Sequence, residues 1–246
     1  VGSADGSVDL WQLPNGEFHA LKHADGARVL SAAIDPRGRM GVTGHENGQI
    51  YFWDLNRGEQ LNTRTHAGKV YAVAFDPTNP NTVLAAGTDA HITFFERSPT
   101  DGKWQRSRRW ARLKHDDAVL CLKTYAVEDH PESLDAPLIV TGVAGGVQVW
   151  SYDDESGIWK ESVRVNALTG VYRLEVWPEK NLIATGDLHG NLRFWSLTTG
   201  KPIGPHRPNF GIVTFLEKSG PDHVLVGTIT GSISRWPLPF AAGETA

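Results

Sequence analysis

Two segments of the sequence carry side chains whose types and spacing could bind a metal ion. Residues 127–136 hold acidic and imidazole groups, which are ligands that divalent cations take from proteins: Glu128, Asp129, His130, Glu132 and Asp135. Residues 153–155 form an acidic triplet. However, no second histidine lies at ligand spacing, and Pro131 and Pro137 are typical of an exposed loop. We therefore predict a solvated loop and a solvated turn, with no metal site.

A local basic cluster could bind phosphate. Beside two tryptophans, it contains Arg106, Arg108, Arg109 and Arg112. These arginines support a hypothesis of nucleic-acid binding. The chain as a whole has a net charge of −4, so it lacks the overall basic field that favours nucleic acid or an anionic membrane surface. We prefer the interpretation of a solvated outer strand and predict that nucleic acid is not a partner.

Catalytic motifs are absent from the sequence. It contains no Gly-x-Ser-x-Gly elbow, no phosphate-binding Gly-x-x-x-x-Gly-Lys-Ser/Thr loop and no His-Glu-x-x-His pair. Residues 142–146 are glycine-rich, but they occupy the same place in a repeat as the turn at 44–48. We therefore predict that the protein is not an enzyme and needs no cofactor.

The remaining composition limits the setting of the protein. The only cysteine, Cys121, excludes an intramolecular disulfide and a cysteine-based zinc site, and fits a reducing, cytoplasmic compartment. No apolar run is long enough for a transmembrane helix, so we expect no membrane association. The chain has no initial methionine and begins within a repeat, so we expect it to be part of a longer protein.

Self-similarity is the strongest signal in the sequence. An aromatic residue closes each unit, at Trp11, Trp53, Phe95, Trp150, Trp195 and Trp236, with successive spacings of 42, 42, 55, 45 and 41 residues. A period near 40 suits four short strands and their connections. The sequence therefore predicts a repeating all-β architecture.

One unit shows the order of its strands. Strands are predicted at 70–75, 82–86 and 92–95, followed by a more charged fourth strand at 105–113. The inner strands are apolar on both alternating faces, so both faces must be covered. Similar sheets stacked around an axis provide that cover, which predicts a β-propeller with the charged strand at its rim.

These units resemble WD40 repeats. The segments 2–11 and 44–54 match the glycine, turn and tryptophan pattern of that family, and four histidines precede first strands: His23, His66, His115 and His206. The resemblance implies a structural hydrogen-bond network within a blade, for which His23, Thr43, Asn47 and Trp53 are the best candidates. Only Trp53-Asp54 keeps the family's Trp-Asp pair, so other blades are expected to be less complete.

The fold we predict is a single propeller domain over residues 1–246, built from four-stranded antiparallel blades. Six third strands are visible. Fuller blades are expected at about 27–65, 69–114, 118–165 and 171–205, whereas the first and last blades are incomplete. We expect the parent protein to close as seven blades.

The function we predict is non-catalytic protein–protein interaction, as a scaffold, recognition or sensor module. In the family, partners commonly dock where the innermost strands begin, and that resemblance implies a surface containing Arg28, Lys69, Tyr71, Leu120 and Tyr172, flanked by Glu46, Asp89 and His189. Tyrosines with basic neighbours are favoured at interface centres, although the tyrosines could instead pack between blades. The alternative is a propeller that binds a small molecule or a metal, possibly as an enzyme, in its central opening.

Overall fold

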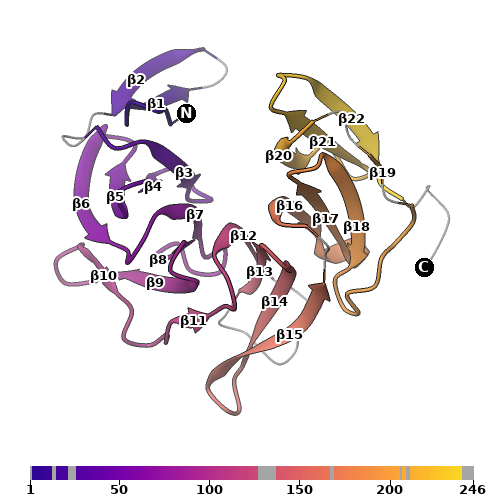
Figure 1. Cartoon of the computed structure of the whole chain (residues 1–246). Coiled ribbons are helices and arrows are strands. Elements are labelled where there is room, and N and C mark those ends of the chain that lie inside the picture. The colour runs from indigo at the N-terminus through magenta and orange to yellow at the C-terminus, as the bar shows by residue number, and fades with distance from the viewer. Residues whose placement is uncertain are drawn as a thin grey trace. The chain divides into compact units, whose positions relative to one another are not determined.

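The computed structural model describes residues 2–12, 15–21, 26–126, 137–166, 169–205, 207–208 and 211–239. These residues form antiparallel strands joined by short turns (Figure 1). The described residues up to Ala126, with Pro137, form one compact unit, and those from Leu138 onward form a second. The single domain and the seven blades expected from the sequence stay predictions.

The first unit contains two complete antiparallel sheets and part of a third. In both complete sheets, neighbouring strands follow one another along the chain. The first of these sheets contains β3 (Val29–Ile34), β4 (Met40–His45), β5 (Gln49–Asp54) and β6 (Glu59–Thr65). The second contains β7 (Val70–Phe75), β8 (Thr82–Gly87), β9 (His91–Arg97), β10 (Trp104–Arg106) and β11 (Leu113–Lys114). Before them, β1 (Val8–Gln12) pairs with β2 (Glu17–Leu21). The last strand of the unit, β12 (Val119–Tyr125), lies beside β7, where the Thr124 hydroxyl donates to the Phe75 carbonyl at 2.7 Å.

The second unit repeats the pattern. Its first strands are β13 (Leu138–Val143), β14 (Gly146–Asp153) and β15 (Ile158–Asn166). A four-stranded sheet follows, with β16 (Val171–Trp177), a 3-10 turn (Pro178–Lys180), β17 (Leu182–Asp187), β18 (Asn191–Ser196) and β19 (Arg207–Pro208). The last sheet has β20 (Val213–Lys218), β21 (His223–Thr228) and β22 (Ile233–Pro237).

The predicted repeat is confirmed at the level of strands. The six repeating aromatic residues lie on β1, β5, β9, β14, β18 and β22, which are the strands expected as the third of each sequence repeat. The antiparallel four-stranded sheets are those expected of propeller blades. Within the part of the chain that the structure describes, no helix is long and apolar enough to cross a membrane.

The inner strands are covered on both faces, as their apolar sequences require. Every residue of β8 and β17 is buried. In the first unit, Phe52 of β5 stacks on Trp104 of β10 with ring centroids 4.6 Å apart, so the two neighbouring sheets share one core. In the second unit, Phe194 of β18 and Val226 of β21 belong to one buried cluster in the same way.

Glycines at the ends of second strands allow this close stacking. A Cβ on Gly44 would lie 2.4 Å from Cγ1 of Val70, which begins the inner strand of the next sheet. A Cβ on Gly186 would lie at the same distance, 2.4 Å, from Cγ1 of Val213. Because real side chains do not approach so closely, the repeated glycine is a packing requirement of the repeat.

The prediction of one continuous fourth strand over 105–113 was wrong. The outer strand is broken into β10 and β11, which both pair with β9. Between them, the Ser107 amide donates to the Phe94 carbonyl at 2.8 Å, and Trp110 turns inward until it is buried. Burial of the large indole ring outweighs the few ladder hydrogen bonds that a continuous strand would add.

Candidate interaction surface

Four of the predicted surface residues come together in the first unit. Arg28 and Lys69 directly precede β3 and β7, and Glu46 follows β4. The Glu46 amide donates to the Arg28 carbonyl at 3.0 Å, and Lys69 Nζ donates to Glu46 Oε1 at 2.6 Å. Tyr71, two residues beyond Lys69, is half-buried. The ends of two neighbouring sheets therefore present two cations, one carboxylate and a phenol on one local surface.

The charges of this group depend on one another. The hydrogen bond and the charge of Lys69 hold the pKa of Glu46 below its usual value, and Arg28 adds to that effect. The same pair raises the pKa of Lys69. Both side chains are about half exposed, at 46% for Lys69 and 45% for Glu46, so water screens the pair and a partner can reach it.

The other predicted surface residues are placed one by one. Leu120, on β12 of the first unit, is half-buried. In the second unit, Tyr172 is the second residue of β16, as Tyr71 is of β7, and it is also half-buried. His189 is exposed in the turn between β17 and β18. The assignment of these residues to partner binding stays a prediction.

Asp89 does not belong to an exposed surface. Its side chain is only 10% exposed, and its carboxylate forms an ion pair with Arg112. Nε2 of the buried His66 lies 3.4 Å from Asp89 Oδ1, and this electrostatic contact lacks hydrogen-bond geometry. Burial lowers the pKa of His66. The charge of Asp89 opposes this lowering, and the charge of Arg112 adds to it. Asp89 turns inward because the guanidinium compensates its charge there.

Of the network expected from His23, Thr43, Asn47 and Trp53, the structure joins Thr43 and Trp53, and His45 takes part with them. Trp53 Nε1 donates to Thr43 Oγ1 at 3.0 Å, and Nε2 of His45 lies 2.9 Å from the same oxygen. His45 Nδ1 lies 2.9 Å from the Ala27 carbonyl, which can only accept. A neutral ring protonated at Nδ1 satisfies both contacts, with the Thr43 hydroxyl donating to Nε2.

Of the two remaining residues of that expected network, the structure describes only Asn47. Asn47 Oδ1 accepts from the Gln49 amide at 3.0 Å within the turn, and His23 lies outside the described residues. His45 directly precedes a turn, yet it is fully buried. Its place two residues after Thr43 was the available signal, because alternate strand residues point to the same face.

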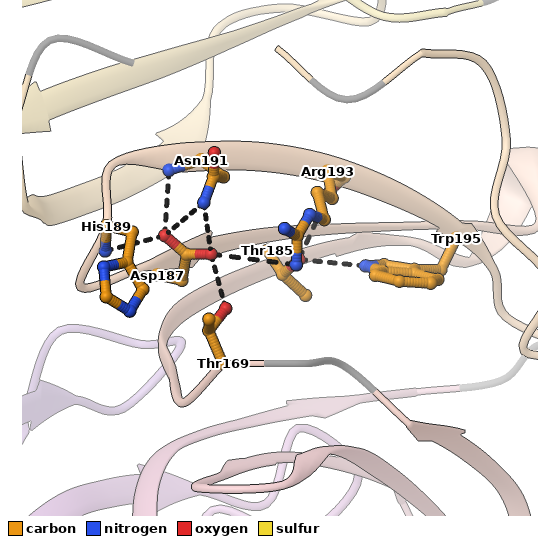
Figure 2. Close-up of polar contacts among 7 residues, drawn as sticks. All are labelled: Thr169, Thr185, Asp187, His189, Asn191, Arg193 and Trp195. Atoms are coloured by element: carbon orange, nitrogen blue, oxygen red, sulfur yellow. Dashed lines mark hydrogen bonds and ion pairs between the residues drawn. The ribbon is translucent and has the colours of Figure 1, made fainter. Parts of the chain in front are cut away.

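In the second unit an aspartate occupies the equivalent position. Figure 2 shows the Asp187 carboxylate surrounded by hydrogen-bond donors. Asp187 Oδ1 accepts from the backbone amides of His189 at 2.9 Å and Asn191 at 2.8 Å. Asp187 Oδ2 accepts from the Thr169 hydroxyl at 2.6 Å, and the Asn191 side-chain amide reaches both oxygens.

The Asp187 carboxylate is held in its charged form. Burial opposes ionisation, but the hydrogen bonds from Thr169, Asn191 and His189 outweigh it and keep the pKa below the usual value. Arg193 Nη1, 3.8 Å from Oδ2, adds a favourable charge. Beside this group, Trp195 Nε1 donates to Thr185 Oγ1 at 2.9 Å (Figure 2). The carboxylate therefore fixes the turn that carries His189.

Sequence comparison agrees with this architecture. Two segments, 17–54 and 58–96, match the family model described as WD domain, G-beta repeat. The chain carries WD40 repeats. Each matched segment begins on the outer strand of one sheet and ends on the third strand of the next, from β2 to β5 and from β6 to β9. The WD40 repeat thus spans two sheets and links them covalently.

Several curated proteins are similar to parts of this WD40-repeat chain. Human angio-associated migratory cell protein is 31% identical over 107 residues, which are 42% of this chain and 24% of that protein. Drosophila melanogaster small ribosomal subunit protein RACK1 is 26% identical over 88 residues, or 36% of this chain and 28% of that protein. Candida albicans polyadenylation factor subunit 2 is 26% identical over 107 residues, or 44% and 19%. The chain thus spans less than a third of the length of each relative.

Of the two acidic segments considered as metal sites, the structure describes only the turn at 153–155. Among the residues that the structure describes, no group of three histidine, cysteine, aspartate or glutamate side chains could hold a metal ion. Asp153, in the acidic turn, accepts a hydrogen bond from Lys160, which lowers the pKa of that carboxyl to about 2. The loop at 127–136 lies outside the described residues.

Proposed function

We propose that this WD40-repeat chain is a non-catalytic protein-interaction module, acting as a scaffold or recognition part of a longer protein. The proposed docking residues are Arg28, Glu46, Lys69, Tyr71 and Leu120 in the first unit and Tyr172 and His189 in the second. We expect it to act in the cytoplasm. Asp89 is not included, because its carboxylate is turned into the fold and bound to Arg112.

The observation that carries this proposal is the group formed by Arg28, Glu46, Lys69 and Tyr71. Lys69 pairs with Glu46, and the charge of the exposed Arg28 acts on the same carboxylate, so a partner carboxylate could form a new ion pair without first desolvating a buried charge. Tyr71 adds apolar area with a polar tip, and a tyrosine loses little conformational entropy on binding. This chemistry suits recognition of a protein surface.

Buried polar groups in each unit already serve the fold. Thr43, His45 and Trp53 are joined by hydrogen bonds, and Asp187 holds a turn in place. A rigid support of this kind keeps surface side chains in place and lowers the entropy cost of binding. The names of two relatives, a small ribosomal subunit protein and a polyadenylation factor subunit, describe components of larger assemblies and support the same proposal.

The test compares the proteins captured by variants of the immobilised chain from an extract of its native cells, using quantitative mass spectrometry. The combined change Tyr71→Ala and Tyr172→Ala should lower recovery of specific partners at least tenfold. Arg28→Glu with Lys69→Glu should have a similar effect and does not disturb buried groups. Tyr152→Ala is the matched control, because that tyrosine packs on Trp159 near the end of β14.

Cooperative thermal unfolding of every variant has to be shown alongside, by circular dichroism. Full recovery of partners by both folded double variants would contradict the assigned surface. A loss of partners with Tyr152→Ala equal to that of the double variants would also contradict it, because the effect would then not be local.

A further inference from the structure

The broken outer strand of the first unit carries a concentration of positive charge. We define the basic segment as residues 103–114, which contain six basic and no acidic residues: Lys103, Arg106, Arg108, Arg109, Arg112 and Lys114. The segment comprises β10, β11 and the connection between them (Figure 1). In a chain of net charge −4, this single-sign stretch is not explained by the overall composition.

The connection between β10 and β11 is firmly anchored. Ser107 Oγ accepts hydrogen bonds from the backbone amides of Arg109 at 3.1 Å and Trp110 at 2.9 Å. The Trp110 ring lies 6.1 Å from that of Phe94, centroid to centroid, and is 7% exposed. The arginines on either side of this anchor are therefore displayed from an ordered backbone.

The four arginines of the segment have different environments. Arg112 is half-buried, forms an ion pair with Asp89, and donates from Nε to Thr93 Oγ1 at 3.1 Å. The exposed Arg109 has its guanidinium carbon 4.4 Å from the centroid of the Trp110 ring, and its charge acts on the buried carboxylate of Asp76. Arg106 and Arg108 are exposed, as are Lys103 and Lys114. Most of the positive charge thus faces solvent.

The outer strand β15 of the second unit shows how a solvated rim strand is arranged when its charges are balanced. Lys160 donates to Asp153 at the neighbouring hairpin, and Arg164 Nε donates to Glu161 Oε1 at 2.5 Å. Its basic groups therefore have acidic partners from the same hairpin. The basic segment contains no carboxylate of its own. Arg112 pairs with Asp89, which lies outside the segment.

We propose that the basic segment binds an extended acidic segment of a partner protein. Guanidinium groups pair with carboxylates in a planar, two-pronged geometry, and exposed arginines on an ordered backbone are suited to that contact. The segment is less suited to binding nucleic acid. Trp104 is 0% exposed and Trp110 only 7%, so neither indole can stack on a base. This surface is separate from the residues of the proposed function, and either can fail alone.

The test uses two synthetic peptides and an oligonucleotide as probes. The peptide (Ser-Glu)₅ is titrated into the ¹⁵N-labelled chain at low ionic strength, with (Ser-Gln)₅ as its uncharged match and dT₈ as the nucleic-acid probe. We expect (Ser-Glu)₅ to shift backbone amide resonances within 103–114 and (Ser-Gln)₅ to shift none. The variant Arg106→Gln with Arg108→Gln should weaken binding of (Ser-Glu)₅ at least fivefold, whereas Lys160→Gln on β15 should change it less than twofold.

Several results would overturn the proposal. These are equal binding of the two peptides, shifts of (Ser-Glu)₅ that fall outside the basic segment, and tighter binding of dT₈ than of (Ser-Glu)₅. Equal weakening by the double variant and by Lys160→Gln would likewise reject it, since the attraction would then be a general effect of charge.

Discussion

The sheet β3–β6 and the sheet β16–β19 share a hydrogen bond between a tryptophan and a threonine, but next to it one sheet has a buried imidazole and the other a buried carboxylate. In both, a tryptophan indole donates to a threonine hydroxyl, from Trp53 to Thr43 at 3.0 Å and from Trp195 to Thr185 at 2.9 Å. Two residues after the threonine, the first sheet has a buried histidine and the second a buried aspartate. The shared arrangement tolerates this exchange because each side chain has its own set of polar partners.

The consequences differ at the adjoining turn. His45 links Thr43 to the carbonyl of Ala27, so it ties the strand to the preceding connection. Asp187 instead accepts from the amides of His189 and Asn191 and so holds the following turn. The next residue is the charged Glu46 in one sheet and the apolar Leu188, 41% exposed, in the other. The same framework can therefore present different chemistry to solvent.

The largest expected difference between the two sheets is in the free energy of unfolding lost when Asp187 or His45 is replaced. Asp187→Ala leaves several hydrogen-bond donors without their acceptor and should lower the free energy of unfolding by about 3 kcal/mol. His45→Ala removes polar contacts to Thr43 and Ala27 and a ring contact with Tyr51, and should cost about half as much, or about 1.5 kcal/mol. Urea unfolding measures both, with Asp154→Ala in an exposed turn as the control. Equal losses would show that the two side chains have the same structural weight.

The glycine at the end of the second strand should be equally sensitive in both sheets. Gly44→Ala and Gly186→Ala each force a Cβ against a valine of the next sheet, so each should cost about 1–3 kcal/mol. Gly145→Ala is the control, since a Cβ there meets nothing within 4 Å, and its effect should stay within about 0.5 kcal/mol. Two stable alanine variants would disprove the requirement for close stacking. Thermal or urea unfolding decides the outcome.

The stabilising contribution of the charged Asp187 side chain should be lost gradually as the pH falls. Because its folded pKa is depressed, its contribution is present above the unfolded value of about 3.9 and is lost as the pH falls through the folded value. The difference in unfolding free energy between wild type and Asp187→Asn should thus shrink below about pH 4, by at most about 1.4 kcal/mol per pH unit. A difference independent of pH between 5 and 2.5 would show that the charge is unimportant.

The smallest expected effects are at the turn residues. Leu188→Glu should change the free energy of unfolding by less than about 0.5 kcal/mol, because the side chain is exposed. Glu46→Leu should leave the thermal midpoint unchanged within error, since its ion pair with Lys69 is screened by water. Differential scanning fluorimetry checks both. A loss of several degrees in either variant would mean that the turn chemistry serves the fold and not the surface.

Much of the fold could be predicted because its signal is local and repeated. The spacing of Trp11, Trp53 and the later aromatic residues located six third strands, and the strand at 70–75 was predicted with the bounds that β7 has. The candidate site was less accessible to prediction. Asp89 was expected at the surface beside Lys69, whereas a guanidinium 23 residues away, that of Arg112, draws its carboxylate inward.

The sequence by itself determined the repeat, the strand order and the need to cover both faces of each inner sheet, because hydrophobic periodicity acts over a few residues. Only the tertiary structure decided which polar groups meet. It paired Glu46 with Lys69, buried His45 against Thr43 and broke the outer strand at Trp110. Such contacts join residues distant in the chain, and their energies depend on distance and burial, which periodicity does not contain.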